Sequence, residues 1–161
     1  MLKPAILYKD IVEEKFAELL YSEDYYFYCG YASGEPFSLN CEDGTYNYVF
    51  VDKNDNVLGF LTYQIWDLVD TVHNFGLISF KKGNTILGKD LFNKLEELIN
   101  NHHKLEWRVI SNNPVKRHYD KFCKKHNGYI CHLHDSVKDL KGNYVDSYIY
   151  EIFNTKRKEG K

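Results

Sequence analysis

The clearest pattern of apolar and polar positions is a pair of β-rich segments joined by a short polar run. The segments YVFV at 48–51 and VLGFLTYQIW at 57–66 flank the polar residues DKNDN. β-Branched and aromatic residues favour strands, so this pattern predicts a β-hairpin. Gly59, inside the second segment, predicts a β-bulge or a close approach of another backbone.

Three other segments place apolar residues at the spacing of an α-helix. The first lies at about 11–22, with the apolar face Ile11, Val12, Phe16, Leu19 and Leu20. The second lies at about 88–101, with the apolar face Leu91, Phe92, Leu95, Leu98 and Ile99. The third follows Pro114, with Val115, Tyr119, Phe122 and His126 on one face. Asp10 and Glu13 have the spacing of a capping box at the first helix. Asn113 and Pro114 suit the N-cap and first position of the third.

The remaining apolar segments are predicted strands. AILY at 5–8 is read as a short first strand, and residues 71–80 and 104–111 flank the second helix. Strand, helix and strand with short connections form a βαβ unit, so these two strands should be parallel neighbours. Residues 129–134 and 144–153 predict a closing hairpin. The fold class is therefore α+β, of three-layer α/β type, with a mixed, mostly antiparallel sheet and helices on both faces.

Length and composition predict one domain over 1–153 and a disordered basic tail over 154–161. The chain has 161 residues, of which 43% are hydrophobic and 27% charged, which is an ordinary globular composition. No apolar run is long enough to span a membrane, and the first ten residues are too short and charged for a signal peptide. Four widely separated cysteines favour reduced thiols and a cytoplasmic protein.

The net charge of −2 conceals an asymmetry. Residues 1–60 contain four Lys against eleven acidic residues, a balance of −7, whereas residues 61–161 contain seventeen basic and twelve acidic residues, a balance of +5. This division is either ordinary surface charge or the sign of two ligands, one anionic and one cationic. A nucleic-acid partner is disfavoured, because such proteins are usually more basic overall.

The junction FKKGNTILGKD, between a strand and a helix, has the character of an anion site. A helix N-terminus presents unpaired backbone N–H groups and a positive dipole end, and both favour phosphate. Lys81, Lys82 and Lys89 add positive charge, and Gly83, Asn84 and Gly88 permit a close backbone approach. The alternative is a solvated polar loop.

Three stretches, in order, resemble the GCN5-related N-acetyltransferase superfamily over nearly the whole chain. DKNDNVLGFLTYQIW resembles its second hairpin, LISFKKGNTILGKDLFNKL its acyl-CoA motif, and SNNPVKRHYDKFCKKHNGY its later motif, with Asn112, Tyr119 and the pair Gly128–Tyr129. The family's phosphate loop carries an Arg or Gln followed by two glycine positions, and of these only Gly88 is retained here.

The resemblance implies transfer of an acetyl group from acetyl-CoA, by direct attack, to an amine of a small molecule or peptide. It also implies that strands 71–80 and 104–111 splay apart, with Gly76 as the bulge that opens them, and that the pantetheine arm pairs with the backbone of the first. The cofactor-binding residues would be Leu77, Ile78, Phe80, Lys82, Gly83, Asn84, Thr85, Ile86, Leu87, Gly88, Lys89, Asn112 and Lys121.

By the same resemblance, Tyr119 would protonate the departing CoA thiolate. A tyrosine that only packs in the core is the alternative, since the chain has fourteen tyrosines. The amine must lose a proton before it attacks, because an alkyl ammonium has a pKa of about 10.4. The candidates for the general base are His73, which is preferred because it titrates near neutral pH, Asp70 and Glu106. No motif singles out any of them; the alternative for each is an ordinary polar residue at a strand edge, with the proton lost through a water relay to solvent.

Two further groups of residues are candidates for ligand binding. The aromatic residues of 25–31, with Glu23, Asp24 and Glu35, lie where the family binds its acceptor, and would suit a cationic amine or pack in the core. Cys123, His126, Cys131, His132 and His134 fit no usual zinc spacing, so no metal is expected. A non-catalytic acyl-CoA-binding protein and a small protein or nucleic-acid interaction module stay open as alternative functions, and homodimerisation stays open as well.

Overall fold

The computed structural model describes residues 1–20, 37–40, 42–80, 85–139 and 141–154. Its centre is a seven-stranded sheet in the order β1-β2-β3-β4-β5-β7-β6. The strands are β1 (Leu2–Pro4), β2 (Thr45–Val51), β3 (Val57–Trp66), β4 (Thr71–Ser79), β5 (Lys104–Ile110), β6 (Tyr129–Lys138) and β7 (Tyr144–Phe153). All neighbours are antiparallel except β4 and β5, which are parallel. The predicted mixed, mostly antiparallel sheet is thus confirmed.

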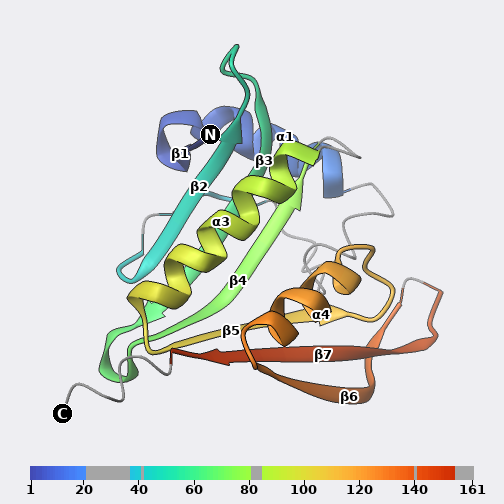
Figure 1. Cartoon of the computed structure of the whole chain (residues 1–161). Coiled ribbons are helices and arrows are strands. Elements are labelled where there is room, and N and C mark those ends of the chain that lie inside the picture. Colours follow the sequence, from blue (N-terminus) through green and yellow to red (C-terminus); the bar gives the residue numbers. More distant parts are fainter. Residues whose placement is uncertain (21–36, 41, 81–84, 140, 155–161) are drawn as a thin grey trace.

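The helices cover both faces of this sheet, as predicted. They are η1 (Ala5–Tyr8), α1 (Lys9–Leu20), η2 (Asp67–Val69), α3 (Thr85–Asn101) and α4 (Lys116–Lys125). In Figure 1, α3 lies in front of β2, β3 and β4, α4 lies over β5 and β7, and α1 lies behind the sheet. The chain therefore forms three layers.

Each face of the sheet has its own apolar core. The α3 and α4 side is centred on Leu91, Leu95, Leu105 and Trp107, all at most 2% exposed. The α1 side is smaller and includes Val12, Phe16, Val49 and Phe60. Burial of one helix stripe against each face explains why the predicted helices form where they do.

The structure confirms both features predicted at Gly59, a β-bulge and a close approach of another backbone. The register passes from Phe50↔Gly59 to Val51↔Val57, which leaves an extra residue on β3. A Cβ at Gly59 would lie 2.6 Å from the carbonyl oxygen of Ile78 and 3.2 Å from a methyl of Leu87. Only a residue without a side chain lets β3, β4 and α3 meet this closely.

The N-terminal prediction was wrong in two respects. Residues 5–8 form the 3-10 helix η1 rather than a strand, and residues 2–4 pair with β2 instead. Helix α1 begins at Lys9, so Asp10 lies inside the first turn and is not the N-cap. The Glu13 carboxylate accepts a hydrogen bond from the backbone N–H of Leu39 at 2.9 Å. A long-range contact has therefore replaced the predicted capping box.

Other boundaries differ by a few residues. Helix α3 begins at Thr85 rather than at about 88. Helix α4 begins at Lys116 with Val115 at the N-cap, because the Asn113 side-chain oxygen accepts the Val115 N–H at 3.0 Å and forms a turn ahead of the helix.

Asn154, which the sequence placed in the disordered tail, is buried. Its backbone N–H donates to the carbonyl of His103 and its side-chain amide donates to the carbonyl of Asn100. Residues 155–161 lie outside the described part of the chain.

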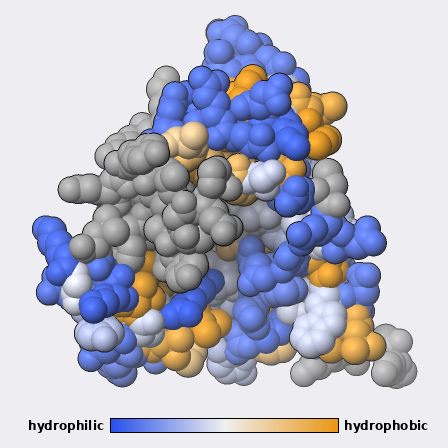
Figure 2. All heavy atoms as spheres, turned by 180° about the vertical axis from the view of Figure 1, so that it is seen from behind, coloured by the Kyte–Doolittle hydropathy of each residue, from blue (hydrophilic) through white to orange (hydrophobic). Residues whose placement is uncertain are grey.

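The described residues on the surface opposite to α3 are mostly polar. Figure 2 shows the molecule from behind, with hydrophilic residues over most of the coloured surface and apolar residues in separate groups. Among the described residues, no helix combines the length and apolar character that spanning a bilayer requires.

Candidate active site

The parallel strands β4 and β5 separate soon after they meet. Their ladder consists of the two pairs Thr71↔Lys104 and Val72↔Leu105, and beyond these the two strands diverge (Figure 1). The splayed pair implied by the family resemblance is thus confirmed. The separation divides the sheet into a β1–β4 half and a β5–β7 half.

The irregularity that accompanies this separation lies at Asn74 and Phe75, not at Gly76 as predicted. The β3–β4 register passes from Thr62↔Gly76 to Gln64↔His73, so β4 carries one extra residue. Asn74 takes φ +51, and its side-chain amide donates to Gln64 Oε1 at 2.6 Å. An inserted residue bends its strand. Asparagine tolerates the left-handed conformation better than most residues, so it can replace the expected glycine.

Beyond the bulge, β3 is the one described strand with which β4 pairs. Leu77 is opposite Leu61, Ile78 is opposite Phe60, and the Phe80 N–H donates to the Leu58 carbonyl at 2.9 Å. The Ile78 side chain is buried on the α1 side. These residues therefore offer backbone groups, rather than polar side chains, to anything that lies between β4 and β5.

The predicted phosphate loop is described only in part. Lys82, Gly83 and Asn84 lie outside the described residues, and Thr85 and Ile86 form the start of α3. Leu87 is 4% exposed and packs in the core, so only its backbone is available to a ligand. A Cβ built on Gly88 would meet nothing within 4 Å.

Lys89 is exposed one residue further along α3. Together with Gly88 it lies in the helix rather than in a loop ahead of it, because α3 begins earlier than predicted. The N-terminal turn of α3 thus has an open surface at Gly88 and a lysine next to it.

Tyr119 projects from α4 into the core between α3 and the β5–β7 half of the sheet. Its ring lies 6.2 Å from that of Phe92 on α3 and 5.4 Å from that of Trp107 on β5. The residue is 5% exposed, and its hydroxyl makes no hydrogen bond with any described residue. Burial raises the pKa of Tyr119 above its ordinary value, which keeps the hydroxyl protonated at neutral pH.

Sequence reasoning missed the residues that surround Tyr119. Trp107 stacks on Tyr150 of β7 with ring centroids 4.9 Å apart, and the Tyr150 hydroxyl donates to Asp120 at 2.7 Å. The Trp107 indole N–H is buried and has no hydrogen-bond partner in the described part of the structure. Their strands were predicted, but the register that brings β5 against β7 was not readable from either segment.

The three candidate general bases differ in whether their side chains are already bound by other residues. His73 is half-buried on β4, next to the last residue paired with β5, and its imidazole makes no hydrogen bond with the described residues. The Asp70 carboxylate binds His102 Nδ1 at 2.8 Å and the His103 N–H at 3.0 Å. Glu106 accepts from Lys104 Nζ at 2.7 Å. His73 is therefore the candidate whose side chain is uncommitted.

The remaining predicted cofactor residues lie at the surface. Asn112 is exposed ahead of α4, where its side-chain oxygen lies 3.4 Å from the Ser111 hydroxyl. Lys121 is exposed on α4 and makes no ion pair with the described residues. The aromatic and acidic residues at 23–35, predicted to bind the acceptor, lie outside the described residues.

Comparison with known proteins supports the fold. No family model and no curated protein matches the sequence. A spermidine N-acetyltransferase from Vibrio cholerae, solved with CoA and spermine, superposes with a TM-score of 0.73 at 16% identity, over 97% of this chain and 96% of that one. A proposed phosphinothricin N-acetyltransferase superposes with a TM-score of 0.70 at 15% identity, over 96% and 98%. This chain thus has the fold of the GCN5-related N-acetyltransferase superfamily.

Proposed function

We propose that this protein is an acetyl-CoA-dependent N-acetyltransferase that acts on an amine of a small molecule or peptide. The observation that carries this proposal is the early separation of β4 from β5, with Tyr119 packed against β5 and α3 on one side of that separation. An enzyme of this kind needs a place for an extended thioester and a proton donor beside it, and the free edge of β4 and the Tyr119 hydroxyl are our candidates for the two.

In this proposal the cofactor follows the unpaired edge of β4. The pantetheine amides bind backbone groups of residues 77–80, as an added strand would. The pyrophosphate binds at residues 82–89, where the first turn of α3 presents unpaired N–H groups. The open surface at Gly88 and the exposed Lys89 support this position.

The reaction proceeds by direct attack. The amine nitrogen forms a bond to the thioester carbonyl carbon, the carbon–sulfur bond then breaks, and the electron pair leaves on sulfur. The thiolate takes the proton of the Tyr119 hydroxyl, which burial keeps in its neutral form. The first proton lost from the attacking ammonium passes to His73 or through water to solvent. The second proton, lost from the nitrogen as the amide forms, restores the Tyr119 hydroxyl, so the net products are the amide, CoA thiol and one proton.

A cationic acceptor suits the charge of the chain. Residues 1–60 carry a balance of −7, and a negative region attracts an amine before it binds. The Vibrio cholerae neighbour was solved with the polycation spermine. We place the reaction in the cytoplasm, on the pattern of separated cysteines, of which Cys123 and Cys131 are free thiols.

A second candidate function is a non-catalytic acyl-CoA-binding protein. The segment from Gly83 to Gly88 retains only Gly88 of the family's glycine pattern, and this departure favours altered cofactor use. A CoA-binding protein without turnover would still bind along β4.

Two measurements on the same sample separate the candidates. Acetyl-CoA should raise the melting temperature, because a ligand that binds only the native state stabilises it. Free thiol should then be released when a panel of amines, including polyamines, is added. A melting shift without thiol release would favour the non-catalytic protein, and the absence of any shift at saturating acetyl-CoA would contradict both.

A further inference from the structure

The hairpin of β6 and β7 brings together three side chains that the reaction does not use. His132 and His134 are two residues apart on β6, so they lie on the same face of the strand. The register His132↔Tyr148 and Leu133↔Ser147 brings the next residue of β7, Asp146, beside His134. Strand pairing thus places two imidazoles and one carboxylate on one surface.

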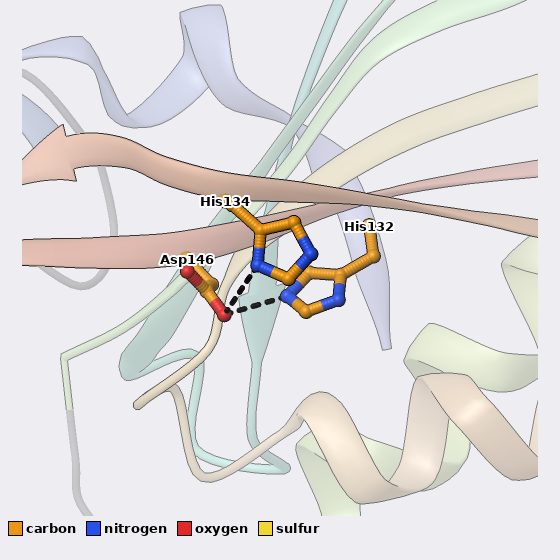
Figure 3. A group of neighbouring side chains, drawn as sticks. All are labelled: His132, His134 and Asp146. Carbon is orange, nitrogen blue, oxygen red and sulfur yellow. Dashed lines mark hydrogen bonds and ion pairs between the residues drawn. The ribbon is translucent and has the colours of Figure 1, made fainter.

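Their donor atoms converge on a single point, as Figure 3 shows. His132 Nε2 lies 2.6 Å and His134 Nδ1 lies 3.7 Å from the same oxygen of Asp146. All three donor atoms lie within 4.8 Å of one another. A zinc ion with bonds of about 2.0–2.1 Å holds its ligand atoms roughly 3.3 Å apart, so small rotations of these side chains suffice to bind one.

Neighbouring groups hold two of the three side chains in place. The second oxygen of Asp146 accepts the backbone N–H of Asp135 at 2.9 Å, and the His132 ring stacks on Tyr148 with centroids 4.6 Å apart. The carboxylate and the His132 imidazole are therefore oriented, as metal ligands generally are.

The second histidine distinguishes this group from an ordinary ion pair. His102 with Asp70 and His126 with Glu96 each join one imidazole to one carboxylate. At 3.7 Å the His134 contact is too long for a hydrogen bond, yet its ring lies 3.9 Å from that of His132. Two imidazoles directed at one carboxylate oxygen are arranged for a shared cation.

We propose that His132, His134 and Asp146 bind one divalent transition-metal ion of the zinc class. Imidazole nitrogens suit zinc, copper and nickel, whereas magnesium and calcium prefer six or more oxygen ligands. Three protein ligands leave at least one coordination position for water. The side chains of the three residues are 37%, 77% and 31% exposed, in that order, so the ion exchanges with solvent.

Zinc titration of the full chain, first stripped with a chelator and free of any affinity tag, tests this proposal. Calorimetry should show one Zn²⁺ bound per chain, and the melting temperature should rise with Zn²⁺ concentration. His134→Gln, His132→Gln and Asp146→Asn should each weaken binding at least about tenfold, since removing even an outer partner of a ligand costs about 10–100-fold. His118→Gln, which removes an exposed histidine from α4, is the matched control and should bind like the parent.

Cobalt provides a second measurement that does not depend on stability. Co²⁺ bound by this set should give visible absorption that Zn²⁺ abolishes and that His134→Gln prevents. His134 is the most exposed of the three, so this variant should keep the native melting temperature without metal. No Zn²⁺ binding by the parent, or zinc binding that all three substitutions leave unchanged, overturns the proposal.

Discussion

The Tyr119 hydroxyl is the side-chain group on which the proposed chemistry depends. The ring is packed by Phe92 and Trp107, as a core tyrosine would be. The hydroxyl, however, makes no hydrogen bond with the described residues. In the proposed mechanism the thioester sulfur would be its partner.

Replacing Tyr119 with Phe should lower turnover by about 10²–10⁴, because general acid catalysis typically contributes this much. The ring and its packing remain, and no hydrogen bond to a described residue is lost, so the melting temperature and CoA affinity should change little. Amine acetylation and thermal melting of the same sample test this. Full activity in this variant would remove Tyr119 from the mechanism.

Tyr150→Phe is the matched control, since it removes a hydroxyl from the neighbouring ring, 6.0 Å away. That hydroxyl donates to Asp120, so its loss should destabilise the protein by about 1 kcal/mol. Urea unfolding measures this change. A stability loss confined to Tyr150→Phe would separate the structural tyrosine from the functional one.

At the scale of elements, Gly59 marks the place where β3, β4 and α3 meet most closely. Gly59→Ala would put a methyl group 2.6 Å from the Ile78 carbonyl oxygen. Because that oxygen belongs to the backbone, β4 must shift, at a cost of about 1–3 kcal/mol. Denaturant unfolding should show this loss.

Gly76→Ala is the control for Gly59→Ala within the same sheet. Its methyl group would meet Thr62 at 3.5 Å, an ordinary contact. The free energy of unfolding should therefore change by less than about 1 kcal/mol. Equal losses in both variants would show that the close approach at Gly59 is not what limits substitution there.

Substitution of Gly88, in the first turn of α3, should have opposite effects on stability and on CoA binding. Gly88→Ala meets nothing within 4 Å and replaces a poor helix former, so the free protein should gain up to about 1 kcal/mol. The same methyl group would stand where the proposed pyrophosphate approaches, so CoA affinity should fall. Calorimetry with CoA and thermal melting measure the two effects, and unchanged affinity would move the phosphate site elsewhere.

At the scale of the whole molecule, the lysines of α4 differ in whether they form ion pairs. Lys116 pairs with Asp120, and Lys125 pairs with Glu96. Lys121 and Lys124 are exposed and make no ion pair with described residues. The unpaired lysines are the ones available to the phosphates of CoA.

Lys121→Ala should therefore weaken CoA binding at low salt, and the difference from the parent should shrink as salt rises, since exposed charges are screened within about 10 Å at 0.1 M. Lys141→Ala, in the turn between β6 and β7, is the control and should bind CoA normally. Titrations at two salt concentrations measure both. If Lys121→Ala binds like the parent at low salt, α4 is a solvated face and not part of the cofactor site.

Local patterns in the sequence determined which elements form. The strands of both hairpins, the helices α3 and α4 and the parallel β4–β5 pair follow from residue period and short connections. The resemblance to a family then implied a splayed pair, and the structure confirms it. Predictions of local structure were wrong where long-range contacts act. The Glu13 carboxylate, for example, binds the Leu39 N–H instead of capping its own helix.

Tertiary structure alone decided the details of the sites. Asn74 rather than Gly76 carries the bulge, because its side chain bonds to Gln64 on the neighbouring strand. Trp107 and Tyr150 meet through the β5–β7 register. Asp146 joins His132 and His134 across a hairpin, so a search for ligand spacing along the sequence predicted no metal. Periodicity is a local property of the chain, whereas these contacts depend on strand register between distant segments, and that register exists only once the sheet has formed.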